Sequence, residues 1–512
     1  MTKSEKRTVL KHTAVFAVAN TVAQGVGVIN SIALRRFLGP MATGVWDILQ
    51  VILGYCGYAS FGTTKAMARD YPYYRGKGNP EKAEHLKDMT LTFSMVMSVI
   101  PAIILLGALI LKWGEMENSF RIGLIFLVGF LFLQRFYDLI MTLLRSDKQF
   151  DLLSQLVIVN AIGGLAATVL FVSWGNIYGL FFGTVVLTLG CLFYMQKRHP
   201  YRFRFYWNNA ELLRQLKLGL PLIAVSSLGQ FLKSMDRIMI AKYLGFYDVG
   251  LYSIAMMAGN YMQDIPMKFS NVSYPNMLQK YGATDSASAI KGYLLKPAFI
   301  FSIFIPFLSG IVILLMPIIV RWFFPKFLPG IPAMNIYLMS LYFVLLNQVS
   351  YNFLLTLDKY LISIPITLMS IAMNIVLNMA FLAQGWGLSG VAAGTTISYI
   401  FRGIATFYYA MQFVKKPIEI WLDILKFSAI ALSLFGGIFL IDYFIQAPSI
   451  YEESFLKLAV FFCICAPFIW ILEKKTGVLK LLVEMIQKKK GVSPKPAVLV
   501  ANENLVEQDL QS

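Results

Sequence analysis

The chain has 512 residues, of which 57% are hydrophobic and only 14% are charged. Soluble domains are about 45–50% apolar and about 25% charged. Here the apolar residues gather in blocks of about 20, the length that crosses about 30 Å of hydrocarbon. This composition excludes a soluble multidomain protein, a disordered chain, a collagen and a disulfide scaffold. The net charge of +18 would indicate nucleic-acid binding in a soluble protein, whereas in a membrane protein its meaning depends on where the charges lie.

The N-terminus is basic up to Lys11 and precedes an apolar segment that contains Ala17-Val18-Ala19, which resembles a signal peptide with a cleavage site. Because the apolar stretch continues to Leu34, we interpret it as an uncleaved first span. Hydropathy predicts about fourteen transmembrane helices. They cover residues 13–34, 45–64, 89–111, 121–144, 153–173, 177–196, 216–240, 249–272, 294–320, 331–356, 361–383, 386–411, 424–445 and 455–472.

The distribution of basic residues predicts the orientation, because cytoplasmic loops are enriched in Lys and Arg. With the N-terminus inside, the inside segments hold 31 of the 45 basic residues and the outside loops hold 7. An odd number of spans would scramble this bias. Both termini are therefore predicted to be cytoplasmic.

Residues 197–215 interleave basic and aromatic side chains, from Lys197 to Trp207. In a soluble protein this pattern could indicate single-stranded nucleic acid. Between two spans, contact with anionic lipid headgroups and the membrane interface is the simpler interpretation. The tail is expected to start with an amphipathic piece, Gly477–Gln487, and to be disordered from Gly491 onward. The four cysteines all lie in apolar blocks and are interpreted as buried hydrophobic residues rather than disulfides or metal ligands.

The two halves of the chain share short motifs at a nearly constant offset. Leu38-Gly39, four residues, Gly44-Val45-Trp46 matches Leu244-Gly245, four residues, Gly250-Leu251-Tyr252 at an offset of 206. Two further matches, of 143–148 with 354–359 and of Gly179 and Gly183 with Gly390 and Gly394, have an offset of 211. Matching spans lie six apart, so the copies have parallel topology and should flank a substrate site.

The predicted fold is all-α and polytopic, with two six-helix repeat bundles and two additional helices. Residues 1–196 form the first bundle, 197–215 a cytoplasmic amphipathic linker, 216–412 the second bundle, 413–475 two C-terminal spans and 476–512 a cytoplasmic tail.

This layout, together with two groups of residues, resembles the multidrug/oligosaccharidyl-lipid/polysaccharide (MOP) exporter superfamily, and within it the polysaccharide-transporter or O-antigen flippase branch. The first group is Arg36-Phe37-Leu38-Gly39-Pro40 with Gly44. The second is Asp236-Arg237, Leu244-Gly245, Gly250 and Tyr252-Ser253-Ile254-Ala255. The resemblance covers about 1–412. It implies a monomeric flippase of the bacterial plasma (inner) membrane that moves an undecaprenyl-pyrophosphate-linked oligosaccharide to the outer leaflet, with polysaccharide assembly proteins as partners.

Charged residues inside the predicted spans are the candidate site residues, because a charge at the bilayer centre costs at least about 2.5–3.5 kcal/mol. Arg135 lies three residues before Asp138, and Arg402 lies near the middle of the twelfth span. In the seventh span Ser226, Gln230, Lys233 and Arg237 recur at helical spacing beside Asp236. At the 206 offset, Asn20 and Gln24 of the first span correspond to Ser226 and Gln230. Other polar candidates are Asn260, Asp264, Asn271, Asn347, Tyr351, Asn374 and Asn378.

We expect Arg135, Arg402, Lys233, Arg237, Gln24, Gln230 and Asn20 to line a cationic cavity, and Asp138 and Asp236 to serve in ion coupling or salt bridges. The alternatives are interhelical hydrogen bonds for the amides, snorkelling for Lys233 and Arg237, and buried structural pairs for Arg135 and Arg402. The predicted spans carry a net charge of +4. This charge suits an anionic cargo, and guanidinium groups match pyrophosphate geometry.

Two other functions are less compatible with the sequence. A small-molecule antiporter of the multidrug type, from the same superfamily, would favour acidic and aromatic sites for cationic drugs, but the predicted interior is net positive. A membrane enzyme such as a glycosyltransferase or polymerase would need an acidic pair or a metal cluster, and none is evident. The sequence has no GxxxxGK[ST] loop for ATP, and we expect no cofactor and no metal.

Overall fold

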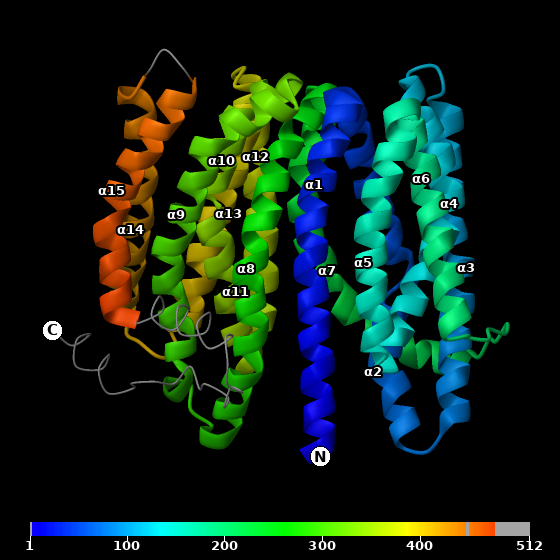
Figure 1. Ribbon diagram of the computed structural model, residues 1–512. Helices are drawn as coiled ribbons and strands as arrows, with labels where there is room; N and C mark the ends of the chain where they lie inside the picture. The colour runs from blue at the N-terminus through cyan, green and yellow to red at the C-terminus, as the bar shows by residue number, and fades with distance from the viewer. Residues whose placement is uncertain (1–2, 447–449, 477–512) are drawn as a thin grey trace. The chain divides into compact units, whose positions relative to one another are not determined.

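The computed structural model describes residues 3–446 and 450–476, and this part of the chain is almost entirely helical (Figure 1). Its α-helices are α1 (Lys3–Cys56), α2 (Thr63–Gly76), α3 (Pro80–Leu111), α4 (Asn118–Ser146), α5 (Phe150–Ala167), α6 (Ser173–Arg198), α7 (Asn209–Tyr243), α8 (Phe246–Thr284), α9 (Gly292–Phe323), α10 (Ile331–Met339), α11 (Leu341–Thr356), α12 (Ser363–Ala383), α13 (Gly387–Met411), α14 (Pro417–Phe444) and α15 (Ile450–Thr476). A π-helical turn, Thr168–Val172, joins α5 to α6. The predicted tail, 476–512, lies almost entirely outside the described residues.

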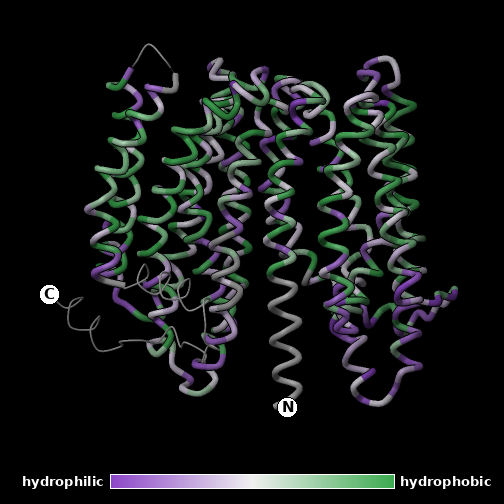
Figure 2. The backbone as a smooth tube through the Cα atoms, in the orientation of Figure 1, coloured by the Kyte–Doolittle hydropathy of each residue, from purple (hydrophilic) through white to green (hydrophobic). Residues whose placement is uncertain are grey.

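The helices have the surface of a protein that faces lipid. Large apolar side chains are exposed along them, such as Ile103 and Ile104 on α3, each 63% exposed. Figure 2 shows that apolar residues occupy the middle of the helices, while hydrophilic residues collect toward their ends. In the described part, nine helical segments are long and apolar enough to cross a membrane, or ten if the bent α7 is included. The chain is therefore a multi-pass membrane protein.

Two of these segments are too long to be single spans. Val18–Ser60 has 43 residues and Phe150–Arg198 has 49, which at 1.5 Å per residue correspond to about 65 Å and about 75 Å. Each contains a break with non-helical backbone, at Gly39 (φ 71°) and at Asn176 (φ 48°). Both breaks lie where the sequence predicts a turn between consecutive spans. The total of fourteen spans and the predicted orientation remain predictions.

Contacts between helices divide the chain into two compact units. The first unit comprises Met1–Gly259, Ile319–Tyr337 and Ile362–Tyr399. The second comprises Asn260–Ile318, Leu338–Leu361 and Ile400–Ser512. The predicted bundles 1–196 and 216–412 are defined by the sequence repeat instead, and they remain a prediction.

The predicted linker, 197–215, includes the end of α6, which continues to Arg198, and the start of α7 at Asn209. Asn208 caps α7, since its side chain accepts hydrogen bonds from the backbone amides of Ala210 and Glu211. The ten residues between the helices, 199–208, are non-helical, and we call them the strap. Tyr201 anchors the strap: its hydroxyl donates to Asp147 Oδ2 at 2.8 Å, and Asp147 also accepts a hydrogen bond from Arg75.

Replacing Tyr201 with phenylalanine should lower the stability of the protein by about 1 kcal/mol, the usual value of one hydrogen bond. Burial and the neighbouring Asp147 carboxylate raise the pKa of the Tyr201 phenol, so the protonated donor is present at neutral pH. A raised pKa stabilises the fold below about pH 10 and this contribution is lost as the pH rises further. The melting temperatures of wild type and variant should therefore differ at pH 7 and converge above pH 10, and a constant difference would contradict this account.

Candidate functional site

The two repeat motifs meet in a reciprocal backbone contact within the first unit. A Cβ atom on Gly44 would overlap the carbonyl oxygen of Phe246 and lie 2.8 Å from the amide nitrogen of Gly250. A Cβ on Gly250 would overlap the carbonyl oxygen of Pro40 and lie 2.8 Å from its Cα. Pro40 and Phe246 are equivalent at the 206 offset, as are the two glycines. The glycines therefore allow the two turns to touch, and we call this contact the glycine latch.

The turns themselves are made by the other glycine of each motif. Gly39 has φ 71° and Gly245 has φ 101°, values that residues with a Cβ rarely adopt. Beside the latch, Arg35 crosses from α1 to α8. Its Nε donates to Ser253 Oγ at 3.2 Å and its Nη2 to the Ser253 carbonyl at 3.0 Å. Arg35 and Ser253 are both buried, so the matching ends of the two repeats are joined by backbone packing and charge-assisted hydrogen bonds.

A polar stripe on α7 faces α1 and α2 of the first repeat. The helix bends by 52° between its parts Asn209–Pro221 and Ser226–Tyr243, where Pro221 removes a backbone donor. Directly after the bend, Ser226 Oγ accepts a hydrogen bond from Lys65 Nζ at 2.6 Å. Further along, Ser234 Oγ lies 2.5 Å from the Tyr55 hydroxyl. The stripe thus lies where α7 contacts α1 and α2.

The charged side chains in and beside this stripe differ in how deeply they are buried. Lys233 is exposed, and Gln230 and Arg237 are half-buried. Asp236 is only 1% exposed, and it accepts a hydrogen bond from the backbone amide of Arg237. The Nε atom of Arg237 is buried and has no hydrogen-bond partner among the described residues. The accessible side of the stripe is therefore cationic.

Lys65 is a site residue that the sequence analysis missed. The hydropathy profile assigns it to the inside loop 65–88, directly after the second predicted span, whereas the structure places it in α2 against the α7 stripe. The position of Lys65 one residue past an apolar block is the only available signal, since the bend in α7 that brings Ser226 to it cannot be read from spacing.

Three other predicted residues lie on different helices. Asn20 and Gln24 are half-buried in α1, and both interact with neighbouring groups. Arg402 is half-buried in α13 and belongs to the second unit. One helical turn later, the Thr406 hydroxyl donates to the Arg402 carbonyl at 2.8 Å and to Asn347 Oδ1 at 3.0 Å. The hydrogen bond to Asn347 links α13 to α11 beside Arg402.

The side chain of Arg135 is hydrogen-bonded to other residues of the protein. Its guanidinium donates to Ser98 Oγ at 3.2 Å, to the Gly57 carbonyl at 3.0 Å and to the Cys56 carbonyl. These carbonyls lie at the end of α1, where intrahelical donors run out. Asp138 accepts a hydrogen bond from Gln134 Nε2 at 2.8 Å and is exposed. The structure thus gives Arg135 and Asp138 separate partners.

A buried cluster of amides joins α7, α12 and α13. Asn374 Nδ2 donates to Thr395 Oγ1 at 3.1 Å, and Asn378 Nδ2 donates to Asn374 Oδ1 at 3.2 Å. Asn374, Asn378 and Thr395 are completely buried. A Cβ on Gly394 would overlap Asn378 Oδ1, so this glycine allows the amide to approach the helix. The cluster fits the interhelical hydrogen bonding that is expected of buried amides.

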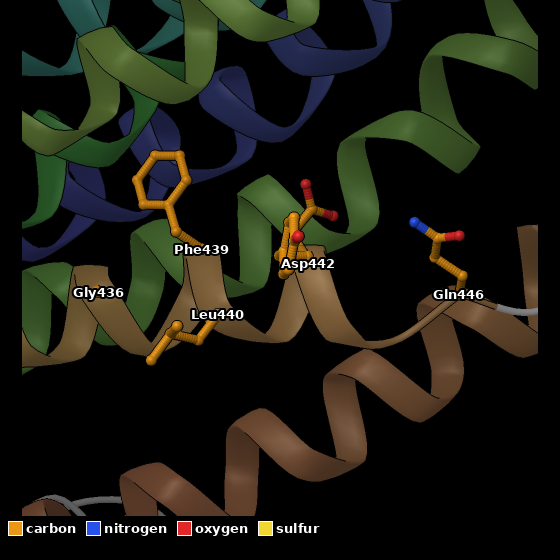
Figure 3. A pocket seen from close by; sticks show the side chains of 6 residues that line it. Gly436, Phe439, Leu440, Asp442 and Gln446 are labelled. Carbon is orange, nitrogen blue, oxygen red and sulfur yellow. The ribbon is translucent and has the colours of Figure 1, made fainter.

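No metal site is evident in the described ranges, where no group of three or more His, Cys, Asp or Glu residues could hold an ion. A pocket lies along one face of α14, lined by Phe439, Leu440, Asp442 and Tyr443 (Figure 3). None of the predicted site residues lines it. The candidate site is therefore the α7 stripe with its neighbours on α1 and α2.

These features define a polytopic membrane protein with a polar site where α7 meets α1 and α2. A model of the family described as polysaccharide biosynthesis protein matches residues 9–280. This match covers more than half of the chain, so the chain belongs to the polysaccharide biosynthesis protein family.

Solved structures show the same fold. "Lipid II flippase MurJ, inward closed conformation" has a TM-score of 0.64 at 16% identity, over 90% of this chain and 99% of that one. An inward-facing multidrug resistance MATE family transporter of the MOP superfamily has a TM-score of 0.57 at 15% identity, over 82% and 96%. A point mutant of the Vibrio cholerae MATE transporter VcmN has a TM-score of 0.55 at 15% identity, over 84% and 98%.

No curated protein sequence matches the chain. The fold is that of the MOP superfamily, as the sequence resemblance predicts. The members of this superfamily are membrane transporters rather than enzymes, and the chain is a transporter of this kind.

Proposed function

We propose that this transporter flips an undecaprenyl-pyrophosphate-linked oligosaccharide across the bacterial plasma membrane during surface polysaccharide biosynthesis. The observation that carries the proposal is the cationic side of the α7 stripe: Lys233 is exposed and Lys65 reaches Ser226, whereas the neighbouring Asp236 is buried. A pyrophosphate is the anionic part of the cargo, and ammonium and guanidinium groups bind it through charge-assisted hydrogen bonds. The family name and the fold shared with a lipid II flippase support the same substrate class.

In this mechanism the pyrophosphate binds to Lys65, Lys233 and Arg237, while the polyprenyl tail stays in the bilayer. The amides of Asn20, Gln24 and Gln230 bind sugar hydroxyls, and Arg402 of the second unit is proposed as a separate cargo-binding residue. Asp236 holds α7 from its buried side, and Asp138 remains a candidate for ion coupling. Two six-helix bundles, with both chain termini in the cytoplasm, rock against each other to give alternating access.

Arg135 has a supporting role in this proposal. Its guanidinium is occupied by Cys56, Gly57 and Ser98, so it fixes the end of α1 and thereby the position of Tyr55 beside the α7 stripe.

Replacing Lys233 with alanine should reduce surface polysaccharide at least tenfold in a strain that lacks the chromosomal gene, and Arg402→Ala should also reduce it. Loss of one hydrogen bond to a charged group costs about 1.5–3 kcal/mol, which corresponds to roughly a 10- to 150-fold loss of cargo affinity. The matched control is Lys242→Ala, an exposed lysine on the same helix. If the Lys233→Ala strain makes a normal amount of surface polysaccharide at a normal level of the protein, the stripe is not part of the cargo site.

Multidrug antiport is the alternative, and the MATE structures share the fold. Drug-resistance assays on a strain that expresses the protein distinguish the two functions. Resistance to cationic drugs, with unchanged polysaccharide in the deletion strain, would support antiport.

A further inference from the structure

We propose that the strap, together with the end of α6, is a binding surface for anionic phospholipid headgroups of the membrane in which the protein resides. The cargo site on α7 is not involved, so this binding is independent of the proposed flippase function. The surface consists of the exposed side chains Lys197, Arg202, Arg204 and Phe205.

From Tyr201 to Arg204 burial alternates along the strap, as it does where successive side chains of an extended chain point in opposite directions, and the alternation ends at the exposed Phe205. Tyr201 is buried and Phe203 is half-buried, while Arg202 and Arg204 between and after them are exposed. On the inner face, the Phe203 ring packs against Phe136 at a centroid distance of 5.1 Å. The two arginines therefore project from the same side.

The inner face is attached firmly enough to hold the outer face in place. Lys87 is 1% exposed, donates to the Arg202 carbonyl and lies over the Phe203 ring at 5.2 Å. The backbone amide of Tyr206 donates to Thr92 Oγ1 at 3.3 Å, and the Tyr206 ring stacks on His85 at 4.4 Å. These contacts fix the strap to α3, so Arg202 and Arg204 are presented on a rigid backbone.

The exposed face of α6 places this surface at the membrane boundary. Leu189 and Phe193 are exposed apolar residues, and Lys197 follows at the same spacing of four on the same side of the helix. The change from apolar to cationic along one lipid-facing stripe marks the end of the hydrocarbon layer. Gln196 joins this point to the strap, since its side chain pairs with both the amide and the carbonyl of Tyr201.

The charge and the aromatic group of the surface fit an anionic headgroup. Arg202 and Arg204 are two residues apart, so their Cα atoms are separated by about 6.6 Å in an extended chain. This separation allows both guanidinium groups to bind one phosphodiester. Phe205 is 81% exposed, and an aromatic side chain at this level is suited to the headgroup region. The sequence contains no acidic residue from 152 to 210, so nothing in this stretch neutralises the arginines.

The test is native mass spectrometry of the purified full-length protein, titrated with phosphatidylglycerol and, separately, with phosphatidylcholine of the same acyl chains. Wild type should bind phosphatidylglycerol more tightly. The double variant Arg202→Ala/Arg204→Ala should lose about 25-fold of that affinity, because two cations near a surface each contribute about fivefold. Phosphatidylcholine binding should be unchanged. The control Arg321→Ala/Lys326→Ala removes the same charge from two exposed positions elsewhere and should stay within twofold of wild type.

Equal phosphatidylglycerol binding by wild type and the strap variant would overturn the proposal. So would a variant that loses affinity for undecaprenyl pyrophosphate but not for phosphatidylglycerol, because the arginines would then belong to the cargo path. If the double variant has a lowered melting temperature, Phe205→Ala replaces it, since this exposed side chain does not support the fold. A several-fold loss of phosphatidylglycerol affinity is again expected, and no loss would again reject the surface.

Discussion

Gly250→Ala is expected to lower the melting temperature of the purified protein by a few degrees and its abundance in the membrane several-fold. The added methyl group would overlap the carbonyl oxygen of Pro40 and approach the Pro40 Cα to 2.8 Å. Both are backbone atoms of the opposite turn, so no side-chain rotation relieves the clash. Overpacking of this kind costs about 1–3 kcal/mol, and more where the structure cannot relax.

The matched control is Gly54→Ala. Gly54 lies in α1, the helix that carries Gly44 of the latch, and nothing lies within 4 Å of a Cβ built there. Alanine has the higher helix propensity, so this variant should be as stable as wild type or more stable. Equal melting temperatures for Gly250→Ala and wild type would show that the latch contact is not maintained in the purified protein.

Arg135→Ala is expected to destabilise the protein by about 3 kcal/mol, and Arg135→Lys should not restore it. Removal of the guanidinium leaves the carbonyls of Cys56 and Gly57 without their donor, and each buried unsatisfied group costs about 1–3 kcal/mol. A lysine ammonium is a single point and cannot reproduce the planar fork that reaches three acceptors. Thermal unfolding of the two variants in detergent measures the effect.

Asp138→Asn serves as the control for Arg135. Asp138 lies on the same helix, is exposed, and accepts a hydrogen bond from Gln134 that an asparagine oxygen can also accept. This variant should unfold like wild type. An Arg135→Ala protein with an unchanged melting temperature and no transport would instead assign Arg135 to cargo binding, the role that its position in the sequence first indicates.

The two turn motifs show which features of the fold can be predicted from the sequence and which cannot. The pattern of Leu-Gly, four residues and Gly predicts a turn, and the positive φ values of Gly39 and Gly245 confirm it. The same pattern does not show that Gly44 and Gly250 serve the contact between the turns rather than the turns themselves. That role depends on two segments about 200 residues apart, and no local spacing encodes it.

The candidate site could be predicted only in part, because local spacing shows which residues share a helix face but does not show which distant segments they contact. Helical periodicity places Ser226, Gln230, Lys233 and Arg237 on one face of α7, and in the structure Ser226 accepts a hydrogen bond from Lys65 of α2. Burial of Asp236, and the approach of Lys65, depend on packing and on the bend near Pro221. Hydropathy of the sequence also predicts spans at α8 and α13, which are not among the nine strongly apolar segments of the described residues.

The glycine latch also bears on the origin of the chain. A contact in which Gly44 meets Phe246 and Gly250 meets Pro40 has the form of an isologous interface, where each partner offers the other the same patch. A half-length ancestor that paired with a second copy of itself would need one such glycine to serve both sides. After duplication and fusion, each glycine contacts a different neighbour. A larger residue in one turn could then be compensated by a change in the opposite turn alone. In a single polypeptide the two halves can therefore diverge while the reciprocal contact between the two turns is kept.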